Sequence, residues 1–127
     1  MQNPAEIVRS FYERLGAGDV AGVLDLIAAD IEWTTMWHYK VTGPGLVGIV
    51  DGIFKPLMAE WSQHSLVPTE LIVDGDTVVS LGDFTGRHAT TGKEARARYA
   101  HVWTIKNGQI ARFRQYIDTL AVEGARS

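Results

Sequence analysis

The side chains best suited to acid–base chemistry lie near the end of the sequence. His101 sits in an apolar stretch, and Asp118 follows it beyond Arg114. A carboxylate that faces an apolar cavity loses hydration, which raises its pKa and suits it to accept and return a proton. An imidazole can donate a hydrogen bond to a developing enolate oxygen or carry the proton itself, and an arginine supplies fixed positive charge. These residue types predict proton transfer on a carbonyl compound.

A hairpin must position these groups. Asn107-Gly108 is a strong signal for a two-residue turn, which pairs Lys106 with Gln109. An uninterrupted ladder then places His101 opposite Arg114. Aromatic area combined with a few polar groups is typical of small-molecule sites. One face is therefore predicted to be a pocket wall, with these members: Tyr99, His101, Trp103, Arg114, Tyr116 and Asp118.

Three further residues are candidates for contact with a ligand. Trp33 belongs to a short stretch rich in β-branched and aromatic residues, and Trp37 lies in the loop after it. Asp83 faces His101 only if the turn near residues 90–92 sets the right register, since a shift of one residue turns a side chain to the opposite face. The alternative for the main pair is that His101 is structural and that Asp118 is solvated or paired with Arg114.

Composition and spacing exclude several other chemistries. The chain has no cysteine, its four histidines lack zinc-ligand spacing, and its glycines form neither a phosphate-binding loop nor a dinucleotide fingerprint. We therefore expect no metal and no cofactor. A net charge of -3 over 127 residues argues against a nucleic-acid partner. The length predicts a single domain over residues 1–127, and the lack of a signal peptide or a long apolar run predicts a cytoplasmic protein without a membrane partner.

The periodicity predicts three helices before most of the strands. Helices are expected over residues 4–16, 19–30 and 46–61, with a break near Lys55 because Pro56 follows. Strands are expected over residues 31–36, 66–73, 77–87, 94–105 and 109–118. The order indicates an α+β fold, in which a strongly curved antiparallel sheet wraps around the helices.

The chain resembles the NTF2-like superfamily of cone-shaped domains, in its SnoaL-like and ketosteroid-isomerase-related branch. The resemblance rests on Phe11-Tyr12, on the run from Gly16 to Asp19, on the run from Asp30 to Trp33, and on the C-terminal stretches 99–103 and 107–119. It implies a cone with a deep apolar pocket and a homodimer formed through the outer face of the sheet. Val102, Phe113 and Ile117 are expected to lie on that outer face.

The same resemblance bears on activity. The positions of the tyrosine and the two aspartates of ketosteroid isomerase hold Phe11, Thr34 and His101, with Tyr12 one residue away and expected to point elsewhere, so steroid isomerisation is not expected. SnoaL-like polyketide cyclases use a histidine and an aspartate of the last two strands, which implies catalytic roles for His101 and Asp118. An epoxide-hydrolase-like set of Asp83, Arg114 and Asp118 is a weaker match.

Two functions remain after the sequence analysis. The first is an enzyme that binds a small hydrophobic carbonyl compound and transfers a proton without a cofactor. The second is a noncatalytic module of the same fold that binds a small ligand or serves dimerisation. Fold alone does not choose between them.

Overall fold

The computed structural model describes residues 3–127, which begin with helix α1 (Pro4–Gly16). The Asn3 side chain accepts a hydrogen bond from the Glu6 backbone N–H at 2.9 Å, and Pro4 occupies the first turn, where it loses no hydrogen bond. One face of the helix is buried, as its apolar spacing predicted. That face consists of Ile7, Val8, Phe11, Tyr12 and Leu15.

The second helix is much shorter than the sequence suggested. Helix α2 (Val20–Leu24) begins at the predicted N-cap Asp19, but strand β1 (Ile27–Thr35) already starts three residues after its end. Ile27 pairs with Ile110 on a distant strand. The prediction of a helix to residue 30 was wrong because this long-range pairing overrides the helical pattern.

The third helical region is continuous but irregular. It consists of α3 (Gly45–Ile49), the wider π-helical turn η1 (Val50–Phe54) and α4 (Lys55–Glu60). Pro56 has no N–H to donate to the preceding turn, and the widened turn lies just before it. A Cβ on Gly52 would come within 1.9 Å of the Lys40 backbone oxygen, so glycine is required where this helix meets the preceding loop.

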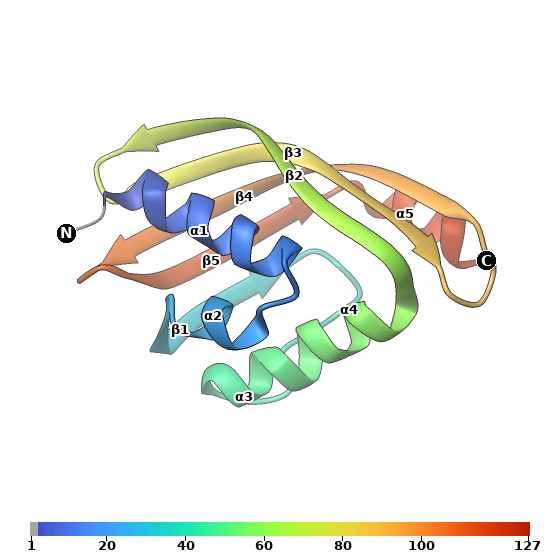
Figure 1. Ribbon diagram of the computed structural model, residues 1–127, viewed down its shortest axis with the longest axis horizontal. Coiled ribbons are helices and arrows are strands. Elements are labelled where there is room, and N and C mark those ends of the chain that lie inside the picture. The colour runs from blue at the N-terminus through green and yellow to red at the C-terminus, as the bar shows by residue number, and fades with distance from the viewer. Residues whose placement is uncertain (1–2) are drawn as a thin grey trace.

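Five strands form one sheet in the order β1-β5-β4-β3-β2. The long strands β2 (Trp61–Asp74), β3 (Thr77–His88) and β4 (Glu94–Lys106) pair antiparallel, as does β5 (Gln109–Ile117) with β4. Strand β1 pairs parallel to β5. The curved sheet arches over α1 and the α3–α4 region (Figure 1), which confirms the α+β cone.

The β4–β5 ladder contains an irregularity that changes which residues share a face. Lys106 pairs with Gln109 and Ile105 with Ile110, as the turn predicted, but Thr104 pairs with Arg112. Ala111 is therefore an extra residue, and the alternation beyond it is inverted. The prediction that His101 lies opposite Arg114 was wrong, because His101 pairs with Gln115.

A helix follows where the sequence analysis expected the last strand to end. Helix α5 (Thr119–Arg126) is capped by Asp118, whose side chain accepts from the Ala121 backbone N–H at 3.1 Å. It packs against β4 and β3 at the end of the cone away from the N-terminus (Figure 1). No helix within residues 3–127 is long and apolar enough to span a membrane.

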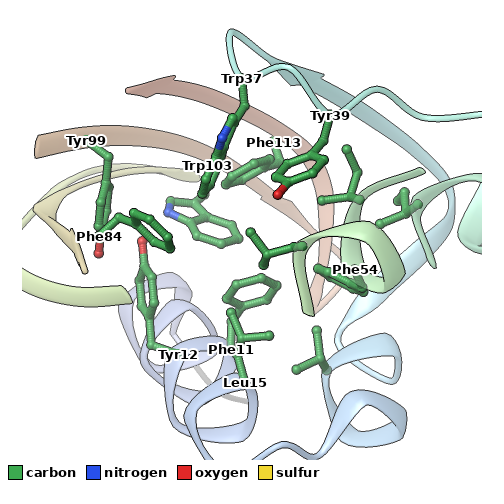
Figure 2. Close-up of a cluster of buried hydrophobic side chains, with 14 of the residues drawn as sticks. Phe11, Tyr12, Leu15, Trp37, Tyr39, Phe54, Phe84, Tyr99, Trp103 and Phe113 are labelled. Carbon is green, nitrogen blue, oxygen red and sulfur yellow. The ribbon is translucent and has the colours of Figure 1, made fainter. Parts of the chain in front are cut away.

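Aromatic side chains fill the space between the helices and the inner face of the sheet. Phe11 and Tyr12 rise from α1 toward the rings of Trp103, Tyr99 and Phe84 (Figure 2). The Phe11 and Trp103 rings meet edge to face with centroids 4.8 Å apart. The interior is thus a packed aromatic core that contains only a small number of polar groups.

Candidate functional site

A buried chain of hydrogen bonds crosses the aromatic interior, and we call it the polar chain. It joins Thr35 of β1, Gln115 of β5, His101 of β4, Tyr12 of α1 and Ser80 of β3. Each residue comes from a different element. Their side chains meet because the sheet curves around α1 and because the extra residue at Ala111 turns Gln115 inward.

The partners of the polar chain determine the tautomer of His101. Thr35 Oγ1 accepts from the Trp37 backbone N–H at 3.0 Å and donates to Gln115 Oε1 at 2.6 Å. The Gln115 amide NH2 therefore donates to His101 Nε2 at 3.0 Å. A neutral imidazole that accepts at Nε2 carries its proton on Nδ1, so Nδ1 donates to the Tyr12 hydroxyl at 2.5 Å.

The remaining bonds complete the chain at its other end. Tyr12 donates to Ser80 Oγ at 2.7 Å, and Ser80 Oγ also accepts from Trp103 Nε1 at 2.9 Å. In this arrangement each hydrogen bond from the Trp37 backbone N–H to Trp103 Nε1 joins one donor to one acceptor. Buried polar groups satisfied in this way define a single arrangement of the surrounding side chains.

Burial keeps the polar chain uncharged. The His101 side chain is 1% exposed, and desolvation lowers its pKa well below the usual 6.5. Desolvation, with a smaller contribution from the neighbouring Tyr99, raises the pKa of Tyr12 far above its usual value. Burial also raises the pKa of Tyr99 to about 12. The imidazole is therefore neutral and both phenols keep their protons at physiological pH.

A small cavity of about 30 Å3 lies beside the polar chain. His101 and Gln115 form its polar end, and its other walls are apolar. The apolar lining consists of Phe11, Leu15, Trp33, Trp37, Ile53, Phe54, Leu57, Leu66 and Phe113. The cavity has room for little more than water, so the aromatic side chains nearly close the interior.

Two indole groups of the cavity wall lack hydrogen-bond partners. Trp33 Nε1 and Trp37 Nε1 are both buried and unpaired. The other two tryptophans differ, because Trp61 Nε1 donates to the Tyr39 hydroxyl at 2.9 Å and Trp103 Nε1 donates to Ser80. A buried N–H without an acceptor is costly and requires an explanation.

Several candidates from the sequence point into the interior of the cone. Tyr99, His101 and Trp103 point inward from β4 and are almost completely buried. The Tyr99 and His101 rings stack with centroids 3.9 Å apart. Trp33 and Trp37 line the cavity.

The other four candidates lie away from the interior. Arg114 pairs with Val102 and Tyr116 with Ala100, which places both on the outer face because of the register change at Ala111. Asp83 pairs with Arg98 and is also outside, since His101 pairs with Ser80 on β3. Asp118 is exposed and caps α5. The structure therefore does not bring Asp118, Arg114 or Asp83 to His101.

The sequence analysis missed three members of the polar chain and misplaced a fourth residue. It did not single out Thr35, Ser80 or Gln115. It expected Tyr12 to point away from the site, whereas the Tyr12 hydroxyl contacts His101. Tyr12 directly follows Phe11 in α1. It still faces the sheet, because both residues lie within the buried face of this helix.

A second polar cluster lies around Glu60 at the end of α4. Its carboxylate accepts from His38 Nε2 at 2.7 Å, His88 Nε2 at 2.9 Å, Arg126 Nε at 2.7 Å and the Tyr39 hydroxyl. Burial opposes ionisation, but these hydrogen bonds outweigh it and lower the pKa of the Glu60 carboxyl. Within residues 3–127 no group of three or more His, Cys, Asp and Glu side chains is arranged to hold a metal ion.

The geometry defines an α+β cone with an aromatic interior and one buried neutral imidazole, and comparisons with known proteins agree with it. The SnoaL-like domain family matches residues 8–113. An NTF2-like protein from Burkholderia thailandensis is 35% identical, with a TM-score of 0.90 over 100% of this chain and 99% of that one. The protein belongs to the SnoaL-like family of NTF2-like domains. A search of curated proteins found no match.

Two other solved structures are similar over almost their whole length. TerC, crystallised together with polyporic acid, is 25% identical with a TM-score of 0.84, and 96% of each chain is covered. IdmH, a putative polyketide cyclase from Streptomyces antibioticus, is 18% identical with a TM-score of 0.82 and covers 98% of this chain and 99% of its own. The likeness to IdmH concerns the fold alone.

Proposed function

We propose that the protein binds a small, flat, mostly apolar molecule with carbonyl or hydroxyl oxygens between α1 and the inner face of the sheet. The observation that carries this proposal is the pair of buried, unpaired indole N–H groups on Trp33 and Trp37, two residues that line the cavity together with His101 and Gln115. Oxygen acceptors on a ligand would satisfy these donors. The aromatic walls supply the apolar contact that such sites use.

The similarity to TerC supports the same kind of ligand. That protein was crystallised with polyporic acid, and it matches this chain over 96% of its length. Polyporic acid is therefore one probe for binding. A neutral aromatic alcohol, 2-naphthol, is the second probe, because the lining of the cavity contains no charged side chain.

The experiment compares ligand binding with stability in matched tryptophan variants. Trp33→Phe and Trp37→Phe remove donors that have no partner in the protein, so each should lower the melting temperature less than the same change at a tryptophan whose indole N–H is bonded. Each should weaken binding of the probes about fivefold, as loss of one hydrogen bond does. Binding is measured by calorimetry, since the variants alter tryptophan fluorescence.

Trp103→Phe is the matched control, because its indole N–H donates to Ser80 inside the polar chain. It should lower the melting temperature, since Ser80 loses a bonded partner, and it should change affinity less than the other two variants. The proposal fails if neither probe binds the wild-type protein at high micromolar concentration. It also fails if the Trp33 and Trp37 variants bind both probes with unchanged affinity.

Proton transfer is the second candidate function, and the tautomer of His101 is the observation that favours it. His101 Nε2 carries no proton, so it can act as a base toward a carbon acid in the cavity once that substrate displaces the Gln115 amide from the Nε2 lone pair. Desolvation makes this imidazole a weak base, so the reaction needs the negative charge of the resulting enolate close to the imidazolium. Asp118 has no part in this mechanism.

Isotope exchange tests the second candidate separately from binding. In D2O the wild-type protein should catalyse replacement of the α-protons of 2-tetralone by deuterium, which NMR follows. His101→Gln should lose this activity, while Asp118→Asn should catalyse the exchange at the wild-type rate. No catalysed exchange in the wild-type protein, together with tight binding of the naphthol, would leave the noncatalytic binding module as the function.

A further inference from the structure

The interior cavity is too small for any of these ligands, so the ligand site must include space that the structure shows elsewhere. Small-molecule sites usually enclose at least about 300 Å3. A surface hollow of about 200 Å3 lies on the other side of Trp37. Its lining consists of Met36, Trp37, His38, Thr119, Val122 and Glu123, so Trp37 is the one residue that lines both spaces.

We propose that the cavity and the hollow are two halves of one elongated binding site, which the Trp37 indole divides and in which α5 forms one wall of the outer half. This inference rests on the proposed function. The inner half takes the flat apolar end of the ligand. The outer half takes a more polar end, because three of its six lining residues, His38, Thr119 and Glu123, have polar side chains.

The Trp37 side chain can turn without breaking a hydrogen bond. Its indole N–H has no partner, and the bond that anchors this residue to the polar chain comes from its backbone N–H. Rotation therefore costs ring packing against Tyr39 and Phe84 but no hydrogen bond. Trp61, which is bonded through its indole to Tyr39, does not have this freedom.

Helix α5 forms one wall of the hollow through Thr119, Val122 and Glu123, and few of its side chains are buried. Only Val122 and Ala125 of its eight residues are buried, and Leu120 is 82% exposed. Polar contacts hold the rest of the helix. Arg126 bonds to Glu60, the Thr91 hydroxyl donates to the Ala125 carbonyl, and Lys93 contacts the carbonyl of the last residue. A segment held in this way opens at lower cost than the core of the sheet.

Glu60 connects α5 to the loop that carries Trp37. Its carboxylate binds Arg126 of α5 and also His38 and Tyr39, the two residues that follow Trp37 in the loop. The Glu60 side chain thus bonds both to the helix that lines the hollow and to the two residues after Trp37. Release of Arg126 should loosen α5 while the loop keeps its own bonds to Glu60.

The first test uses two probes of different length. 2-Naphthol fits the inner half together with the space of a displaced indole, and 6-phenyl-2-naphthol extends into the outer half. Met36→Trp fills the hollow from an exposed position and should weaken the long probe at least about tenfold, while the short probe binds as before. Val47→Trp, at an exposed position of α3 outside both halves, is the matched control and should affect neither.

The outcomes separate this inference from the proposed function. If neither probe binds the wild-type protein, the proposed function fails. If both bind but Met36→Trp weakens them equally, or weakens neither, the proposed function stands and the two-part site is wrong.

The second test needs no ligand. Arg126→Gln should increase amide hydrogen exchange in α5 about tenfold, whereas Arg87→Gln, which breaks the exposed ion pair with Glu94, should leave α5 unchanged. Trp37→Ala should speed both association and dissociation of the long probe. Unchanged exchange in α5 on loss of Arg126, or unchanged probe kinetics in Trp37→Ala, would overturn the inference.

Discussion

The Nε2 atoms of His101 and Gln115 lie 3.0 Å apart across the β4–β5 ladder, both buried at the polar end of the cavity. The Gln115 amide serves two partners, because it donates to His101 and accepts from Thr35. Removal of this amide leaves the Thr35 hydroxyl hydrogen without an acceptor and His101 Nε2 without a donor.

Gln115→Leu should therefore lower the free energy of unfolding by about 2 kcal/mol, the cost of leaving buried groups unsatisfied. Urea titration measures the change. Gln109→Leu replaces an exposed glutamine at the start of the same strand and should stay within about 0.5 kcal/mol of wild type. Equal effects of the two variants would show that the polar chain does not stabilise the fold.

The stability of the protein should fall as the pH drops below about 6.5. Burial lowers the pKa of His101 well below 6.5, so the unfolded chain binds a proton that the folded chain excludes. The neutral, buried His101 contributes fully to stability above the pKa that histidine has in the unfolded chain. This contribution is lost as the pH falls toward the lower pKa of His101 in the folded protein. The free energy of unfolding should be about 1 kcal/mol lower at pH 5.5 than at pH 7. Urea titrations at the two pH values measure this difference.

Burial also lowers the pKa of His64, which acts in the same direction. The His64→Gln variant removes that second contribution, and the loss due to His101 should remain. NMR titration of the ring protons provides the independent measurement, because a His101 resonance that titrates near pH 6.5 would contradict the neutral buried imidazole.

Asp118 should behave as a helix cap. Asn caps a helix about as well as Asp, so Asp118→Asn should leave stability nearly unchanged, while Asp118→Ala should cost about 1 kcal/mol and speed amide exchange in α5. Binding of 2-naphthol should persist in both variants. If Asp118→Asn abolished binding or turnover with the fold intact, the carboxylate would have a role that its exposed position does not explain.

We expect a homodimer formed through the outer face of the sheet. Ile72, Val79 and Val102 pair in one row across β2, β3 and β4, and Tyr116 on the same face is 45% exposed. Phe113 and Ile117, which the sequence placed on this face, pair instead with Trp103 and Tyr99 on the inner face.

Light scattering at about 10 µM should show a dimer, as burial of such an apolar row favours. Val102→Glu should convert the protein to a monomer, and Val47→Glu at an exposed position of α3 should not. A wild-type monomer at this concentration would contradict the prediction.

The sequence predicted local elements well and the partners of side chains poorly. Residues 4–16 have a clear helical period and follow the N-cap Asn3, and residues 107–108 determine the hairpin turn, so these elements were confirmed. The bulge at Ala111 has no local signature, since alanine fits a regular strand. Because of this one extra residue, Gln115 and not Arg114 lies opposite His101.

The ends of two helices also differed from the prediction. Helix α2 stops early because Ile27 pairs with a residue more than eighty positions away, which no local pattern reports. Helix α5 did carry a signal, because Asp118-Thr119 is a typical helix start, and an interpretation of Asp118 as catalytic concealed it. The family resemblance predicted the cone, and the structure alone identified the polar chain.

The polar chain takes one residue from each of five elements that span the sequence from Tyr12 to Gln115. A partly assembled chain that lacks any one of these elements would leave a hydroxyl, an amide or an imidazole dehydrated and alone. Intermediates are therefore disfavoured, and the sheet and α1 should melt in one all-or-none transition, while α5 can detach from that cooperative unit by itself.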